Sequence, residues 1–305
     1  MTTVAVCAPA KINLALHVTG RRDDGYHLLD SLVAFAGVGD LLQIREAGSG
    51  TLTVSGPEAE GVPTGSGNLV LRVAAAFWPP VAPICFHLDK RLPAAAGIGG
   101  GSADAAACFR GLAVLRAARG DAEDLAAPEA IAELLSIGAD VPMCVTCAPA
   151  RVEGIGERLS PVEGLPAFPV VLANPRVSVP TGAVFGGLER RENPPMEDLP
   201  ADPSDRAALL AWLARQRNDL EAPALSRAPE IGQALGALRE TAGCRLARMS
   251  GSGATCFALY DDDRAAEAAA EALRVAHPGW WVVATRLDGA RRSEPLALSD
   301  ADAPA

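Results

Sequence analysis

Four glycines lie within five residues of the chain, at positions 97, 99, 100 and 101. An alternating apolar run at 84–88 precedes them and predicts a strand, and an alanine-rich run to about residue 118 follows and favours a helix. Glycine has no Cβ and adopts positive φ, so a ligand can lie directly against the backbone amides of such a loop. Amides at a helix start also attract anions. The segment therefore predicts a phosphate-binding loop, with a flexible glycine turn as the alternative.

Ser102 and Asp104 stand at the expected start of this helix, and both are residue types that cap helix N-termini. A Walker loop is excluded because it ends in Gly-Lys-Ser/Thr, whereas Gly101 is followed directly by Ser102. A dinucleotide fingerprint would need its third glycine at position 102 and an acidic residue ending a strand about twenty residues on. Asp121 is near that distance but follows a helix and a turn-like Arg-Gly pair. Neither scheme fits the loop.

Lys11 and Asp140 are the candidate charged residues for chemistry at a bound phosphate. Only two of the 27 lysine and arginine residues are lysines, Lys11 and Lys90, which indicates positions that need a compact ammonium group. Lys11 just precedes an apolar strand, and Asp140 lies in an apolar run after a helix end, where an unpaired charge is costly. A contact between the two would relieve both and keep the carboxylate ionised, able to accept a proton. Two unrelated surface charges are the alternative.

The composition predicts a globular enzyme with an acidic surface. With 305 residues, 49% of them hydrophobic and 21% charged, the chain is long enough for two domains or for one large domain with an ample core. A net charge of −10 argues against nucleic acid or an anionic membrane as the main partner, although local basic groups could bind a small anion. No apolar run approaches the roughly 18 residues of a membrane span, and no basic signal-peptide start is present, so we expect a cytoplasmic protein.

Seven scattered cysteines do not form the pattern of a disulfide framework. Cys144 and Cys147 form a single C-x-x-C without a second pair or a nearby histidine cluster, which does not indicate zinc. Their apolar surroundings favour small buried residues over a redox pair.

Hydrophobic periodicity predicts strands and helices that alternate along the chain. The predicted strands are two short ones within 4–18, on either side of residues 8–11, and others at 41–45, 51–54, 169–173, 254–260 and 280–285. The predicted helices are 68–78, 128–137, 207–216, 230–242 and 264–276. A polar turn is expected at 21–25, and the charged, proline-rich stretch 189–206 indicates a loop or a disordered insert. This mixture, with a βαβ-like C-terminal part, favours an α+β fold over a doubly wound sheet.

The glycine segment resembles the phosphate loop of the GHMP kinases, Pro-x-x-x-Gly-Leu-Gly-Gly-Gly-Ser-Ser. The matching residues are Pro93, Gly97, Gly99, Gly100, Gly101 and Ser102, and Ile98 replaces the leucine conservatively. Two positions depart from the pattern. Ala103 stands where a second serine is common, which removes one hydroxyl contact, and Asp104 stands where an asparagine is common. A carboxylate near bound phosphate is unfavourable, so Asp104 is expected to point away or to cap the helix.

Further motifs resemble the branch of the GHMP kinases that acts on 4-diphosphocytidyl-2-C-methyl-D-erythritol. They are Pro-Ala-Lys-Ile-Asn-Leu at 9–14, Gly-Arg-Arg at 20–22, Asp-Gly-Tyr-His at 24–27, Ser-Leu at 31–32, Gly-Ala-Asp-Val-Pro at 138–142, Glu-Gly-Ile-Gly-Glu at 153–157, Asn-Pro-x-Val-Ser-Val-Pro-Thr at 174–181, Asn-Asp-Leu-Glu at 218–221 and Ser-Gly-Ser-Gly-Ala at 250–254. The resemblance runs from about residue 6 to 287. It implies the two-domain GHMP kinase fold: an N-terminal mixed domain like the second domain of ribosomal protein S5 at 1–165, a C-terminal ferredoxin-like domain at 166–288, and a mobile tail at 289–305.

The same resemblance implies that the γ-phosphoryl group of ATP is transferred to the 2-hydroxyl of that cytidine diphosphate compound, in non-mevalonate isoprenoid synthesis. Asp140 would accept the hydroxyl proton and Lys11 would hold Asp140 ionised. The implied ATP-binding residues are Pro93, Ala94, Ala95, Ala96, Gly97, Ile98, Gly99, Gly100, Gly101, Ser102 and Ala103, with Asn68 near the adenine. The implied acceptor-binding residues are Asn13, Tyr26, His27, Thr181, Gly251 and Ser252.

In this assignment Tyr26 and His27 would recognise cytosine, although an aromatic side chain packed on the core is the alternative for Tyr26. Ser102 is the one candidate magnesium ligand, and Mg²⁺ is expected to arrive bound to ATP. A monomer or weak homodimer is expected. Homoserine and mevalonate kinases are the competing members of the superfamily, and a non-catalytic nucleotide-binding module is the competing class.

Overall fold

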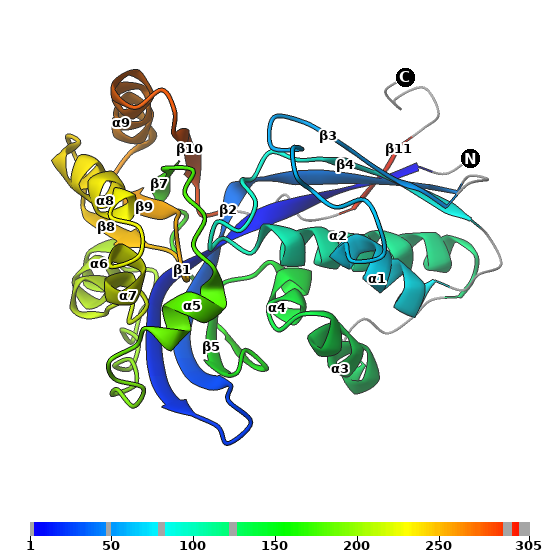
Figure 1. Cartoon of the computed structure of the whole chain (residues 1–305), viewed down its shortest axis with the longest axis horizontal. Helices are drawn as coiled ribbons and strands as arrows, with labels where there is room; N and C mark the ends of the chain where they lie inside the picture. The colour runs from blue at the N-terminus through cyan, green and yellow to red at the C-terminus, as the bar shows by residue number, and fades with distance from the viewer. Residues whose placement is uncertain (1–2, 47–49, 79–82, 122–126, 289–294, 299–305) are drawn as a thin grey trace.

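The computed structural model describes residues 3–46, 50–78, 83–121, 127–288 and 295–298. One sheet is built from β1 (Thr3–Arg21), β2 (His27–Glu46), β3 (Leu52–Ser55), β4 (Ile84–Asp89), β5 (Ala150–Gly154), β6 (Arg158–Pro161) and β11 (Leu296–Leu298). Its order is β11-β1-β2-β4-β3, and β5 pairs with both β2 and β6. Most neighbours run antiparallel, while β3 and β4 are parallel. β1 and β2 form a long hairpin that extends beyond the rest of the sheet (Figure 1).

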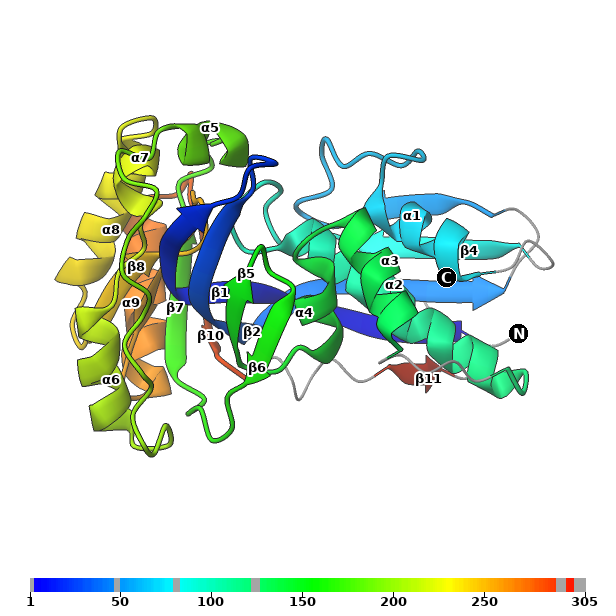
Figure 2. The ribbon, with the colours of Figure 1, turned by 90° about the horizontal axis from the view of Figure 1, so that it is seen from below.

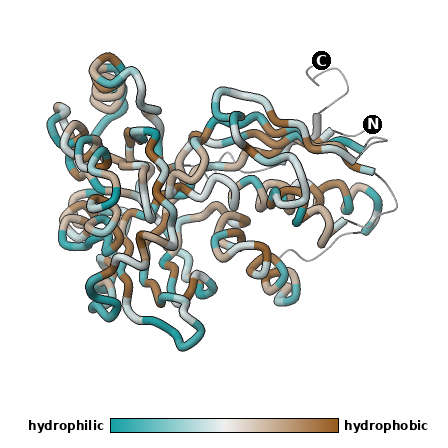
Figure 3. Tube along the Cα trace, viewed as in Figure 1, coloured by the Kyte–Doolittle hydropathy of each residue, from teal (hydrophilic) through white to brown (hydrophobic). Residues whose placement is uncertain are grey.

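The expectation of two short strands within 4–18 is wrong, because β1 is a single strand. Its pairing with β2 shifts register between Pro9 and Lys11, between Asn13 and Ala15, and between Val18 and Gly20. Such bulges bend a strand without ending it, so Pro9, which suggested a break between two strands, lies within one continuous strand. The polar turn expected at the hairpin tip is confirmed, and Figure 3 shows the tip as hydrophilic.

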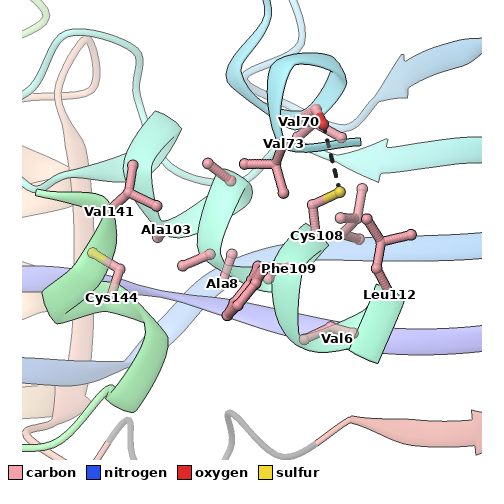
Figure 4. Close-up of a cluster of buried hydrophobic side chains, with 14 of the residues drawn as sticks. Val6, Ala8, Val70, Val73, Ala103, Cys108, Phe109, Leu112, Val141 and Cys144 are labelled. Atoms are coloured by element: carbon pink, nitrogen blue, oxygen red, sulfur yellow. Dashed lines mark hydrogen bonds between the residues drawn. The ribbon is translucent and has the colours of Figure 1, made fainter. Parts of the chain in front are cut away.

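In the described part of the chain, the helices on one face of this sheet are α1 (Leu69–Phe77), α2 (Gly100–Ala118), α3 (Pro128–Ile137) and α4 (Val141–Thr146). Helices α2 and α4 contact the sheet, while α1 and α3 pack against other helices of the layer. The alanine-rich α2 lies closest, and its contacts with β1 and α1 dominate the packing. Figure 4 shows Phe109 and Leu112 of α2 in one cluster with Val6 of β1 and Val70 of α1, and all four side chains are buried. The predicted helices at 68–78 and 128–137 are confirmed as α1 and α3, whereas the short α4 was not predicted.

The second sheet has the order β10-β7-β9-β8 and is antiparallel throughout. It consists of β7 (Pro169–Asn174), β8 (Leu246–Met249), β9 (Cys256–Leu259) and β10 (Trp281–Arg286). Its helices are α5 (Thr181–Gly186), α6 (Arg206–Arg215), α7 (Glu221–Leu225), α8 (Glu230–Glu240) and α9 (Asp263–Ala276). Helices α8 and α9 contact this sheet, so the chain order gives the βαββαβ unit of a ferredoxin-like domain, as expected.

The middle of the β1–β2 hairpin packs against this second sheet. Ile12 and Leu14 of β1 share a buried cluster with Leu172 of β7 and Phe257 of β9, and Figure 2 shows the hairpin beside β7. Buried Arg248 of β8 donates to the Leu14 carbonyl oxygen at 2.6 Å, which ties the two parts of the chain together. The hairpin therefore belongs to both cores, and the domain limits at 165 and 288 remain a prediction.

Two segments were expected to lie outside regular structure, the stretch 189–206 and the C-terminal tail. The stretch 189–205 contains no helix or strand, and it is held in place where the Met196 N–H donates to buried Asp30 at 2.8 Å. It is a loop and not a disordered insert. In the tail, Leu296–Leu298 pair with Thr3–Ala5 and so belong to the sheet, while 289–294 and 299–305 lie outside the described residues. Among the helices that are described, none is long and apolar enough to cross a membrane.

Candidate active site

A cleft of about 900 Å³ opens between the two domains. It is lined by the middle of β1, the glycine loop and the start of α2, residues just before α4, the helix α5, and residues 251–252 of the second domain. Most of the residues that the sequence singled out therefore meet in one place.

Lys11 and Asp140 meet on the floor of this cleft. The Lys11 Nζ donates to Asp140 Oδ2 at 2.7 Å, so the predicted pairing is observed. The Lys11 side chain is 8% exposed, but that of Asp140 is 39% exposed. Asp140 directly precedes α4 and lines the cleft. Its apolar sequence neighbours had suggested a position in the core instead. The carboxylate is thus both held by an ammonium group and open to a ligand.

The glycine loop ends at Gly99, and α2 begins at Gly100 without a side-chain cap. The expectation that Ser102 or Asp104 caps this helix is wrong, because both residues already lie inside its first turn and a cap must precede it. Gly99 instead enters the helix in the left-handed conformation, with φ 66°. The first-turn N–H groups, which line the cleft at Gly100, Gly101 and Ser102, are left without a side-chain acceptor.

The loop residues divide between the cleft and the core. Those in the cleft wall are Ala95, Ala96, Gly97, Gly99, Gly100, Gly101 and Ser102. Pro93, Ile98 and Ala103 are buried, and Ala94 is exposed outside the cleft wall. Ile98 supports the site indirectly, because its carbonyl oxygen accepts from the Lys11 N–H at 2.9 Å.

Gly97 and Gly251 bring the two domains into backbone contact. A Cβ on Gly97 would lie 2.6 Å from the Ser250 carbonyl oxygen, and a Cβ on Gly251 would lie 2.7 Å from the Gly97 carbonyl oxygen. Both residues also have positive φ, so glycine is required at each for conformation and for space. The Ser250 hydroxyl donates to the Gly97 carbonyl oxygen at 3.1 Å. The loop of one domain is thereby fixed by the other.

Asp104 points away from the cleft into a buried charge cluster beneath the loop. Its Oδ2 accepts from Lys90 Nζ at 2.8 Å, and Lys90 also donates to Asp40. Asp40 further accepts the N–H groups of Arg91 and Leu92 at 2.6 and 2.8 Å. Burial, with the neighbouring Asp40 opposing the Lys90 ammonium, raises the pKa of Asp104 to about 8. The departure from asparagine therefore adds an ionisable group behind the loop rather than a charge beside the phosphates.

His27 and Phe185 stack at the other end of the cleft, with ring centroids 4.8 Å apart and an interplanar angle of 25°. The Nε2 of His27 is buried and has no hydrogen-bond partner among the described residues. Burial, followed by the charges of Arg21 and Arg191, lowers the pKa of His27, so its ring is neutral at pH 7. Tyr26 is 59% exposed, which rejects the alternative of an aromatic packed on the core.

Phe185 was missed by sequence reasoning, although a signal exists. It stands four residues after Thr181, so the two share one face of a helix. α5 is only six residues long, too short for a hydrophobic period to reveal it.

Asn13, Thr181 and Ser252 also line the cleft. The Asn13 Nδ2 donates to the Ser31 hydroxyl at 2.8 Å, while its buried Oδ1 has no partner in the described part of the chain. The hydroxyls of Thr181 and Ser252 lie 2.9 Å apart. The cleft wall thus contains one unpartnered acceptor and two hydroxyl groups.

Asn68 does not line the cleft. Its Oδ1 accepts from the Val70 N–H at 2.9 Å and its Nδ2 donates to the Pro63 carbonyl oxygen at 2.7 Å, so the side chain is occupied as the N-cap of α1. Its neighbour Leu69 is the residue that reaches the cleft wall. A contact between Asn68 and adenine stays a prediction.

Metal ligands are sparse in the described residues, which contain no group of three or more histidine, cysteine and carboxylate side chains that could hold an ion. Ser102 is half-buried in the cleft wall. Cys144 and Cys147 are buried, as expected.

Comparison with known families finds two matching models. The GHMP kinases N terminal domain matches residues 68–147, and the GHMP kinases C terminal model matches residues 197–277. Together they include the glycine loop, Asp140 and helices α6 to α9 of the second domain.

Among proteins with assigned names, the chain is 51% identical over 293 residues to the 4-diphosphocytidyl-2-C-methyl-D-erythritol kinase of Roseobacter denitrificans, with 96% of each chain covered. It is 54% identical over 287 residues to that of Dinoroseobacter shibae, with 93% of this chain and 95% of the other covered. A crystal structure of 4-(cytidine 5'-diphospho)-2C-methyl-D-erythritol kinase superposes with a TM-score of 0.73 at 35% identity, covering 92% of this chain and 98% of that one. A homoserine kinase from Cytophaga hutchinsonii superposes with a TM-score of 0.67 at 18% identity over 97% of each chain, which shows a shared fold alone.

Proposed function

The chain belongs to the family of 4-diphosphocytidyl-2-C-methyl-D-erythritol kinases within the GHMP kinases, and we propose that it transfers the γ-phosphoryl group of ATP to the 2-hydroxyl of that acceptor in the non-mevalonate route to isoprenoids. The observation that carries the proposal is the contact between Lys11 and Asp140 directly beside the glycine loop. A Cβ on Gly99 would lie 3.2 Å from Lys11 Cβ, so the ammonium-held carboxylate and the uncapped amides border the same space.

Asp140 is proposed as the general base. Its Oδ2 is held by Lys11, and its Oδ1 carries no hydrogen bond from the described residues, which leaves a lone pair for the acceptor hydroxyl. As the hydroxyl oxygen attacks the γ-phosphorus, its proton passes to Asp140 and the bond from that phosphorus to the β–γ bridging oxygen breaks, releasing ADP. Lys11 keeps the carboxylate ionised before the transfer and offsets negative charge developing on the phosphoryl oxygens.

The glycine loop is proposed to hold the ATP phosphates. The uncapped first-turn N–H groups of α2 fit an anion, because they have no acceptor of their own and the helix N-terminus carries partial positive charge. Mg²⁺ would enter with ATP and would neutralise part of the phosphate charge, and the Ser102 hydroxyl in the cleft wall would be the protein group that holds it. Phosphoryl transfer needs mainly such positioning and charge neutralisation.

The stacked pair His27 and Phe185, with exposed Tyr26 beside it, is proposed to bind cytosine. Aromatic faces bind bases by stacking. A neutral imidazole offers one donor and one acceptor, and the unpartnered, buried Nε2 of His27 matches the hydrogen-bonding edge of the base. Neither homoserine nor mevalonate has a base to occupy this end of the cleft.

Asn13 and the Thr181–Ser252 pair are proposed to hold the methylerythritol unit. The unpartnered Oδ1 of Asn13 requires a donor, because a buried acceptor left unpaired costs about 1–3 kcal/mol. A hydroxyl of the polyol supplies that donor, and Gly251 allows a close approach, since a Cβ there would lie 3.3 Å from the same oxygen.

Phosphorus NMR of the product tests the proposal. Incubation with ATP and the acceptor should yield ADP and one new phosphomonoester signal, with the cytidine diphosphate signals retained. The 2-hydroxyl is on a carbon without hydrogen, so the new signal should lack the three-bond splitting by a proton that a primary or secondary ester shows. A split signal, or loss of the diphosphate signals, would contradict the proposed position of transfer.

A further inference from the structure

Two arginines with no assigned role line the base-binding end of the cleft, one from each domain. Arg21 ends β1 of the first domain, and Arg191 follows α5 of the second domain by five residues. Both line the cleft together with Tyr26, His27 and Phe185. Sequence reasoning had given neither a function.

Neither guanidinium group is neutralised by a carboxylate among the residues that the structure describes. The adjacent Arg22 differs, because it pairs with Asp24 at 2.8 Å. Arg21 makes one contact, from Nε to the Gly25 carbonyl oxygen at 3.2 Å, and this contact orients the group while leaving both Nη atoms available. Arg191 makes no side-chain hydrogen bond in the described part of the chain.

The positive charges of Arg21 and Arg191 both act on the His27 ring. After burial, the positive charges of Arg21 and then Arg191 are what lower the pKa of His27, so both lie within electrostatic reach of its ring. Asp24 is the carboxylate that lines this end of the cleft, and Arg22 offsets its charge. A protein with a net charge of −10 thus presents two uncompensated cations beside its base-binding stack.

We infer that Arg21 and Arg191 bind the diphosphate group of the acceptor and so select a nucleoside diphosphate conjugate over acceptors without phosphate. The inference rests on the proposed function, since it assumes that a cytidine base occupies the His27–Phe185 stack. Guanidinium groups match phosphate oxygens in a two-pronged geometry and stay charged at all working pH values. Because the two arginines come from different domains, the diphosphate also links the domains when it binds.

Calorimetric binding of CDP and of cytidine, each in the presence of a saturating non-hydrolysable ATP analogue, isolates the diphosphate contribution. The analogue keeps CDP out of the ATP-binding part of the cleft. Arg191→Gln and Arg21→Gln are the test variants. Arg190→Gln is the matched control, because it removes the same charge one residue away from a side chain that does not line the cleft.

We expect each test variant to weaken CDP binding by about 3- to 30-fold, a range below that of a buried charge-assisted contact because both arginines are exposed. Cytidine affinity should stay at its original value, and Arg190→Gln should change neither. The CDP affinity of the original protein should also fall as salt is added, and less so in the test variants.

Equal losses of CDP and cytidine affinity would overturn the inference, since they would place the arginines at the base. A loss of the same size in Arg190→Gln would overturn it too, since it would reflect net charge alone. Turnover of the acceptor by the original protein is measured separately. If the original protein is active and the arginine variants lose CDP and cytidine affinity equally, only the arginine assignment is contradicted. If the original protein is inactive, the proposed function is contradicted.

Discussion

Lys11 and Asp140 are 129 residues apart in the chain, yet Lys11 Nζ lies 2.7 Å from Asp140 Oδ2. β1 brings the lysine and the residue before α4 brings the aspartate, while the glycine loop packs against Lys11 through the Ile98 carbonyl oxygen. The fold thus joins the ammonium, the carboxylate and the phosphate-binding amides, although each comes from a different element.

Asp140→Asn should lower kcat by about 10²- to 10⁴-fold, the range typical for the loss of a general base. The amide keeps the shape of the side chain but cannot accept the hydroxyl proton. ATP affinity, measured by calorimetry, should change little because the glycine loop is untouched. A variant with nearly normal kcat would show that Asp140 has a structural role only.

Phe185→Ala and Tyr26→Ala should raise the acceptor KM with little effect on the KM for ATP. Loss of base stacking costs about 1–3 kcal/mol, which corresponds to about 5- to 150-fold if KM reports binding. Initial-rate kinetics with each substrate varied in turn provide the measurement. Equal shifts in both KM values, together with a large fall in Tm, would indicate that these rings stabilise the fold instead.

Gly101→Val and Gly100→Val should have different effects although the glycines are adjacent. Gly101 lines the cleft, and a Cβ there would have Leu69 as its one described neighbour within 4 Å, at 3.8 Å. Valine at this position should therefore weaken ATP binding by about 5- to 150-fold through overpacking against the phosphates, while Tm is retained. A Cβ on Gly100 lies 3.3 Å from Lys90 Nζ, in the buried charge cluster, so valine there should lower Tm. Calorimetry with ATP and thermal melts of both variants check this. The reverse pattern would mean that the phosphates approach from the Gly100 side.

Asp104→Asn should stabilise the protein increasingly as pH rises. The folded pKa of Asp104, about 8, lies above the ordinary value of 3.8, so the folded state binds the extra proton between these values. Stability from this group is complete below about pH 4 and is lost as pH rises to about 8. The Tm of the variant minus that of the original protein should therefore grow across this window and level off above it. A difference that shrinks with pH would show that Lys90 stabilises the ionised carboxylate.

Sequence reasoning located the site through residues whose chemistry needs a partner or a special backbone. The Lys11–Asp140 contact followed from two charges flanked by apolar residues, and the glycine loop followed from its place between a strand and a helix. The main helices were also found because their hydrophobic periods are long, whereas the ferredoxin-like second domain was implied by the family resemblance, and strand β8 (Leu246–Met249) was not predicted.

Features that depend on the local backbone conformation, or on the direction in which a side chain points, were not predicted. The predicted cap of α2 was wrong because the left-handed conformation of Gly99 sets where the helix begins. Side-chain type alone does not reveal this backbone conformation. β1 was split at Pro9 because a bulge is invisible in an alternating pattern. The pairing of Asp104 with Lys90 requires the fold, since neither residue type nor spacing shows which side of the helix faces the loop.

Acceptor selection by the purified protein tests the central claim most directly. A coupled ADP-release assay with ATP would compare 4-diphosphocytidyl-2-C-methyl-D-erythritol, homoserine and mevalonate at equal concentrations. The geometry of the His27–Phe185 stack and of the Lys11–Asp140 pair predicts turnover with the cytidine diphosphate compound and none with the other two. Turnover with homoserine or mevalonate, and none with the cytidine compound, would contradict the account.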